Sequence, residues 1–61
     1  MYNFRFKVVG TDGTHYFVSL NFRWYGECFV YARKYVRSSD DIKQVDIYTC
    51  KNDRLIATFY H

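Results

Sequence analysis

Residues 2–22, YNFRFKVVGTDGTHYFVSLNF, contain two runs of alternating apolar and polar side chains on either side of one turn signal. In the first run every second residue from Tyr2 to Val8 is apolar, and in the second every second residue from Tyr16 to Phe22. A period of two is typical of a half-buried β-strand. Both runs are therefore predicted to be strands.

The two runs also predict how the strands pair. Antiparallel partners must point to the same face of a sheet, and placing Val8 opposite Tyr16 satisfies that condition. This register leaves a loop of residues 11–13. Three-residue hairpin loops commonly end in a left-handed residue, and Gly13 occupies that position. Turn chemistry and hydrophobic alternation thus predict the same hairpin.

A helix is predicted after the second strand, because the apolar spacing lengthens to three and four residues. Its start falls between Asn21 and Gly26, and residues 38–41 form its exit. Trp24, at the junction, is expected to plug one end of the core; the alternative is an exposed side chain that would serve as a binding hot spot. The apolar face comprises Tyr25, Cys28, Phe29, Ala32, Tyr35 and Val36.

Alternation returns in two further runs, residues 44–50 and 54–60. Placing Thr49 opposite Leu55 keeps both apolar sets on one face, across a second three-residue loop. Asn52 and Asp53 in that loop tolerate left-handed backbone geometry better than most residues. A second hairpin is predicted.

The predicted order is β-β-α-β-β in one domain, residues 1–61. The fold class is α+β with two layers: a four-stranded, mainly antiparallel sheet with one helix on one face. Strand order stays open, because the helix can join neighbouring parallel strands or carry the second hairpin to the opposite edge.

Composition excludes several classes of protein. The 61 residues are 49% hydrophobic and 23% aromatic, too apolar for a disordered chain. No apolar run approaches the roughly 20 residues that span a bilayer, and the first residues lack the pattern of a secretion signal. We expect no membrane association and a cytoplasmic location.

The face that the helix leaves open is predicted to be the binding surface, because it mixes aromatic and basic side chains. Three interpretations compete: an ordinary solvated sheet, self-association through this face or a sheet edge, and binding of another protein. The leading hypothesis is a non-enzymatic protein-binding module, as a monomer or a homodimer. The residues assigned to the site are Arg5, Lys7, Phe17, Tyr48, Arg54, Ile56 and Tyr60.

Nucleic-acid binding is the alternative hypothesis. The net charge is +3, and residues 1–37 hold six bases and two acids, whereas residues 38–61 hold three bases and four acids. Bases of a single strand could stack on Phe17, Tyr48 or Tyr60 while Arg5, Lys7 and Arg54 contact phosphates. Steep salt dependence would distinguish this function from protein binding.

No pattern in the chain predicts catalysis, a cofactor or a metal site. Neither a zinc-type spacing nor a phosphate-binding glycine loop occurs. Alternation places Cys28 in the core and Cys50 on the open face, so the two cysteines are predicted to be separate reduced thiols. We expect a protein that is not an enzyme.

Residues 45–59, VDIYTCKNDRLIATF, with the helix before them, resemble small uncharacterised proteins of phages and mobile elements. The resemblance covers about the last 35 residues and consists of a helix followed by a hairpin. Some proteins of this kind inhibit host defence machinery, as anti-CRISPR proteins do. The resemblance implies an inhibitor that occludes a host protein.

Overall fold

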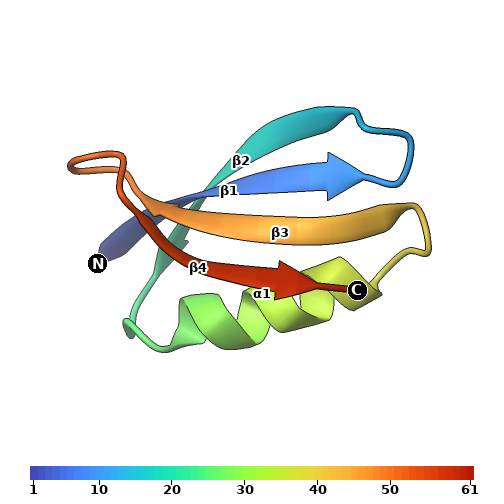
Figure 1. Ribbon diagram of the computed structural model, residues 1–61. Helices are drawn as coiled ribbons and strands as arrows, with labels where there is room; N and C mark the ends of the chain where they lie inside the picture. The colour runs from blue at the N-terminus through green and yellow to red at the C-terminus, as the bar shows by residue number, and fades with distance from the viewer.

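The computed structural model describes all 61 residues and contains four strands and one helix. Figure 1 shows the helix lying along one face of a twisted sheet. The predicted α+β class and the β-β-α-β-β order are confirmed. The elements are β1 (Tyr2–Gly10), β2 (His15–Phe22), α1 (Glu27–Arg37), β3 (Ile42–Thr49) and β4 (Leu55–Tyr60).

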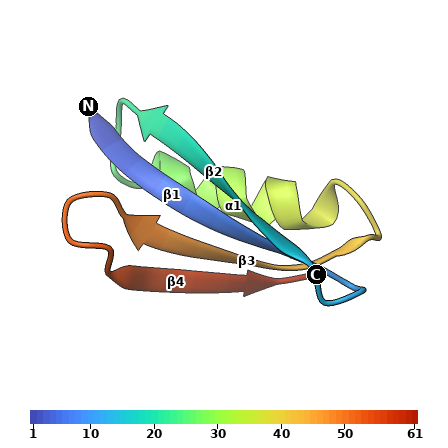
Figure 2. The same ribbon diagram turned by 90° about the horizontal axis from the view of Figure 1, so that it is seen from above.

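The strand order is β2-β1-β3-β4, and every neighbouring pair is antiparallel. The central strand β1 pairs with β2 on one side and β3 on the other, as the view in Figure 2 makes clear. The connection through α1 therefore carries the second hairpin to the opposite side of β1, which is the second of the two predicted alternatives.

The hairpin between β1 and β2 has the predicted register. Val8 lies opposite Tyr16, and Gly13 has a φ of 89°, in the left-handed region that favours glycine. The Asp12 carboxylate accepts hydrogen bonds from the hydroxyl and the backbone N–H of Thr14, at 2.7 and 3.0 Å. These hydrogen bonds lower the pKa of Asp12, and the bond from the Thr14 hydroxyl has the larger effect. The turn chemistry thus sets the pairing of the two strands.

The second hairpin keeps the predicted register from the pair Gln44–Tyr60 to the pair Ile47–Ala57 and departs from it only next to the loop. Asp53 has the expected left-handed backbone, with a φ of 53°. Tyr48, however, lies opposite Leu55, whereas Ile47 lies opposite Ala57, so one extra residue is inserted at the start of β4. Such a bulge breaks the alternation of faces. Leu55, predicted to be buried, is consequently half-exposed.

The core lies between α1 and the middle of the sheet. β1 and β3 contribute the largest side chains, since both are central strands, and α1 adds small residues that let it approach the sheet closely. The predicted helical face is confirmed for three of its members. The fully buried side chains are Phe4, Phe6, Val8, Cys28, Ala32, Val36, Val45 and Ile47.

The helix does not lie over the middle of the sheet. It packs mainly against β3 and β4, contacts β1 less, and leaves β2 almost uncovered. Tyr16 of β2 is therefore half-exposed, and Val18 and Leu20 are only partly buried although they belong to the helical side of the sheet. The helix is too short and too polar to cross a membrane. The uncovered strand is one of the places where the molecule presents apolar surface.

Candidate protein-binding surfaces

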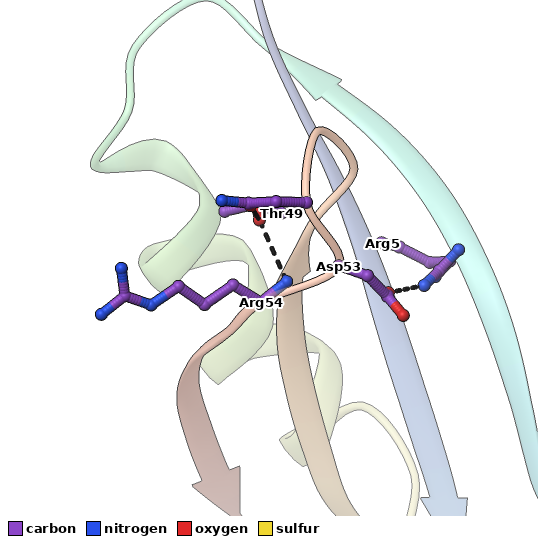
Figure 3. Close-up of polar contacts among 5 residues, drawn as sticks. Arg5, Thr49, Asp53 and Arg54 are labelled. Carbon is purple, nitrogen blue, oxygen red and sulfur yellow. Dashed lines mark hydrogen bonds and ion pairs between the residues drawn. The ribbon is translucent and has the colours of Figure 1, made fainter.

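On the open face, the structure gathers part of the predicted site around Arg5. The Arg5 guanidinium lies over the Phe17 ring, 5.3 Å from its centroid, and Tyr48 is the cross-strand neighbour of Arg5 on β3. The guanidinium also forms an ion pair with Asp53, shown in Figure 3. Arg5 is thus held between an aromatic ring and a carboxylate of its own chain.

Lys7 lies at the centre of the same face, between Phe17 on β2 and Asp46 on β3. Asp46 was predicted to be on the open face, yet it is only 6% exposed. Its carboxylate accepts a hydrogen bond of 2.8 Å from the Gln44 amide. This part of the open face therefore carries the polar side chains of Lys7, Gln44 and Asp46, of which the last two are hydrogen-bonded to each other.

Three predicted residues lie outside this cluster. Tyr60 is 71% exposed but belongs to β4, the edge opposite Phe17, so three strand spacings, about 14 Å, separate the two rings. Ile56 is the unpaired residue of the bulge and packs against the core. Arg54 precedes β4, and Figure 3 shows its side chain pointing away from Arg5. The predicted site is thus only partly assembled.

Trp24 is 66% exposed, so its predicted place in the core is wrong. A tight turn before α1 explains this position. The Trp24 backbone N–H donates to the Glu27 carboxylate at 2.8 Å, and the Glu27 N–H donates to the Trp24 carbonyl at 3.1 Å. The carboxylate is also favourable at a helix N-terminus. The turn is fixed by its backbone, and the indole points outward.

Trp24 borders a hollow of about 470 Å³ between the start of α1 and the end of β2. Tyr31 forms one wall, since its ring packs 5.5 Å from Phe22 and 6.0 Å from Phe6 between centroids. Val30 on the same side of α1 is 56% exposed. The lining comprises Phe22, Trp24, Gly26, Glu27, Val30, Tyr31 and Lys34.

A second hollow continues along the helix and shares Tyr31 and Lys34 with the first. At this end the Tyr16 and Tyr35 hydroxyls lie 2.9 Å apart and tie β2 to α1. That hydrogen bond, together with partial burial, raises the pKa of Tyr35 to about 12. We call the two hollows together the α1–β2 groove.

One rim of the α1–β2 groove is formed by α1, whose Lys34 lines the groove together with the acid Glu27. This helix carries Arg33, Lys34 and Arg37, and none of them has a carboxylate within ion-pair distance, because the ion pairs of the chain are Arg5–Asp53 and His61–Asp40. The only acid of α1, Glu27, is engaged by the Trp24 backbone. The excess of basic residues on α1 therefore attracts anionic groups.

The groove was not predicted, because most residues on the outer side of the helix are polar. Val30 and Tyr31 lie outside the spacing of the buried face of the helix. Two apolar residues on the side of a helix that has no predicted partner were the sequence feature that could have indicated this surface. Their significance depends on the offset of the helix from β2, which hydrophobic spacing does not determine.

Cys28 is buried as predicted, whereas Cys50 lies in the turn that follows β3, beyond the end of the strand. Cys28 is buried under α1, where its Sγ donates to the Tyr25 carbonyl at 3.1 Å and burial raises its pKa. Cys50 is exposed. No three side chains of His, Cys, Asp or Glu approach closely enough to hold a metal ion together.

No protein-family model matches this chain, and neither the curated proteins nor the solved structures searched contain a significantly similar one. The resemblance to small phage proteins consequently stays a prediction.

Proposed function

We propose that this chain is a non-enzymatic protein-binding module whose contact surface is the α1–β2 groove. The observation that carries the proposal is the concentration of exposed apolar side chains around one hollow: Trp24, Val30 and Tyr31 are 66%, 56% and 43% exposed. Grouped apolar residues on a small protein mark interaction sites, whereas singly scattered ones are ordinary. The open face has only scattered ones.

The composition of the groove matches that of protein-binding hot spots. Tryptophan and tyrosine are enriched at such positions, because each provides a large rigid surface and one polar group. Tyr31 is already fixed by Phe6 and Phe22, so binding orders little of its side chain. A preformed surface of this kind loses less entropy when a partner docks.

The excess of basic residues on α1, which borders the groove, favours an acidic partner. Because Arg33, Lys34 and Arg37 lack carboxylates of their own, the complementary surface presents acidic side chains around an apolar centre. If the chain is an inhibitor, as its resemblance implies, it would act by covering such a surface on a host protein.

The predicted open-face site and the nucleic-acid alternative receive less support. Arg5 is paired with Asp53, and Arg54 points away from it, so the cations proposed to contact phosphates do not form one track. Asp46 places a carboxylate in the same face. A nucleic-acid backbone requires a continuous positive groove.

Capture from lysate of the source cell tests the proposal, with the double variant Trp24→Ala/Val30→Ala compared with Tyr60→Ala. Both changes remove exposed side chains, so folding is preserved, and Tyr60 lies at the far edge of the sheet. We expect the groove variant to lose a protein that wild type and Tyr60→Ala retain. Equal capture by all three would contradict the proposal.

The captured protein is then mapped with a photo-crosslinking residue at position 30. We expect adducts on a segment rich in Asp, Glu and apolar residues. Binding to a labelled single-stranded oligonucleotide is measured in parallel at low salt. Tight binding that falls steeply with salt would favour the nucleic-acid alternative instead.

A further inference from the structure

We infer that the free edge of β2 is a pairing surface for a second copy of this chain, joined strand to strand in an antiparallel dimer. The inference is independent of the proposed partner and concerns backbone groups of β2. β2 is the edge strand next to β1, and α1 barely contacts it. Nothing in the structure covers its outer side.

β2 lacks the features by which natural proteins protect sheet edges. Its eight residues include no proline, no glycine, no lysine and no acid, and its pairing with β1 has no register shift. The other edge, β4, is protected better: it has six residues, a register shift and more contact with α1. Long regular edges without charge or bulges favour pairing with another chain.

The first hairpin shows which backbone groups of β2 are free. The Gly10 N–H donates to the Thr14 carbonyl at 2.8 Å, so that pair and every second pair after it are hydrogen-bonded. The residues of β2 between these hydrogen-bonded pairs direct their backbone N–H and C=O groups away from β1, toward solvent. None of their backbone groups takes part in a turn, loop or side-chain hydrogen bond. They are His15, Phe17, Ser19 and Asn21.

These four residues are self-complementary about Val18. When two β2 strands meet antiparallel with Val18 opposite Val18, Phe17 faces Ser19 and His15 faces Asn21 of the second copy. All four outward residues then pair, giving about eight hydrogen bonds across the interface. No two like charges are placed opposite each other, and both sheets keep their faces aligned.

The same register buries apolar side chains on the helical side. Tyr16 lies opposite Leu20 of the second copy, and Val18 lies opposite its own equivalent. Tyr16 is half-exposed although its hydroxyl meets that of Tyr35, and Val18 and Leu20 are only partly buried, because α1 packs mainly against β3 and β4. Self-pairing of one strand also closes on itself about a two-fold axis and leaves no further β2 edge, so it yields a dimer and no fibre.

Analytical ultracentrifugation of Ser19→Pro tests the inference, with Ser19→Thr as the matched control. Proline removes the outward N–H of Ser19 but no bond to β1, and proline is tolerated on edge strands in this orientation. We expect wild type and Ser19→Thr to sediment at twice the 7.4 kDa chain mass. Ser19→Pro should dimerise at least about tenfold more weakly, because symmetry removes two bonds at once.

Cysteine crosslinking keeps the inference testable if Ser19→Pro does not fold. In a Cys50→Ser background, Val18→Cys should form an interchain disulfide upon mild oxidation, since directly opposite residues lie within bonding reach. Tyr60→Cys on β4 should not. A monomeric wild type at high concentration would overturn the inference, as would crosslinking at position 60 with none at position 18.

Discussion

Two glycine substitutions are expected to change stability in opposite directions, although both sites have room for a methyl group. A Cβ added at Gly13 or at Gly26 meets no atom within 4 Å. Gly13 has a φ of 89°, whereas Gly26 has a φ of −70° and a ψ of −15°, a helical conformation. Steric contacts are therefore equal, and only backbone preference differs.

The magnitudes follow from that difference. An L-residue in the left-handed region is less favourable by about 1–2 kcal/mol, so Gly13→Ala should destabilise the fold by that amount. At Gly26 alanine reduces the entropy of the unfolded chain without strain, which should add about 0.4–1 kcal/mol. For a domain of this size each kcal/mol corresponds to about 4–8 °C in Tm.

Thermal and urea unfolding monitored by circular dichroism measure both changes, with every variant at the same chain concentration so that association does not bias the comparison. We expect Gly13→Ala to melt below wild type and Gly26→Ala above it. A higher Tm for Gly13→Ala would refute the left-handed turn, and a lower Tm for Gly26→Ala would refute the helical conformation assigned to Gly26. Gly26 also lines the α1–β2 groove, so Gly26→Ala should weaken partner capture while raising Tm.

Three further results are expected. Hydrogen bonding to Tyr16 raises the pKa of Tyr35 from 10.0 to about 12, so this hydrogen bond stabilises the fold below pH 10 and the stabilisation is lost between about pH 10 and 12. Tyr16→Phe should lower the pH of the last tyrosine transition in an ultraviolet titration, and no change would contradict the contact. Cys50 should react quickly with a thiol reagent and Cys28 only upon unfolding, because Cys28 is buried and its pKa is raised. Equal reaction rates of the two thiols would show that α1 does not pack against the sheet as described. Asp53→Asn removes an exposed ion pair but keeps a residue that tolerates the φ of 53° at this position, so the free energy of unfolding measured in urea should change by less than about 1 kcal/mol. A larger loss would show that Asp53 has a structural role beyond that ion pair.

Local patterns predicted much of the fold because they act over a few residues. Alternation and Gly13 together determined the first hairpin, and the spacing of Cys28, Ala32 and Val36 determined the buried side of α1. The bulge at Leu55 was not predictable, because the alternation of apolar residues in the sequence of β4 continues through it. The inserted residue nevertheless moves Leu55 to the other face of the sheet.

The proposed binding surface was harder to predict because it depends on tertiary placement. Trp24 is apolar enough for a core, and only the turn closed by Glu27 directs it outward. The groove exists because α1 packs over β3 and β4 and leaves β2 uncovered. Strand order and helix offset arise from the packing of the whole molecule, and no segment alone encodes them.

The environment of Trp24 tests the central proposal most directly. Trp24 is the only tryptophan, so 5-fluorotryptophan labels one site of the protein. Its ¹⁹F resonance is recorded in H₂O and D₂O as the captured partner is added. We predict a solvent-exposed signal in the free chain that shifts and loses its solvent isotope effect upon binding. An unchanged, solvent-exposed signal at saturation would contradict the assignment of the α1–β2 groove as the binding surface.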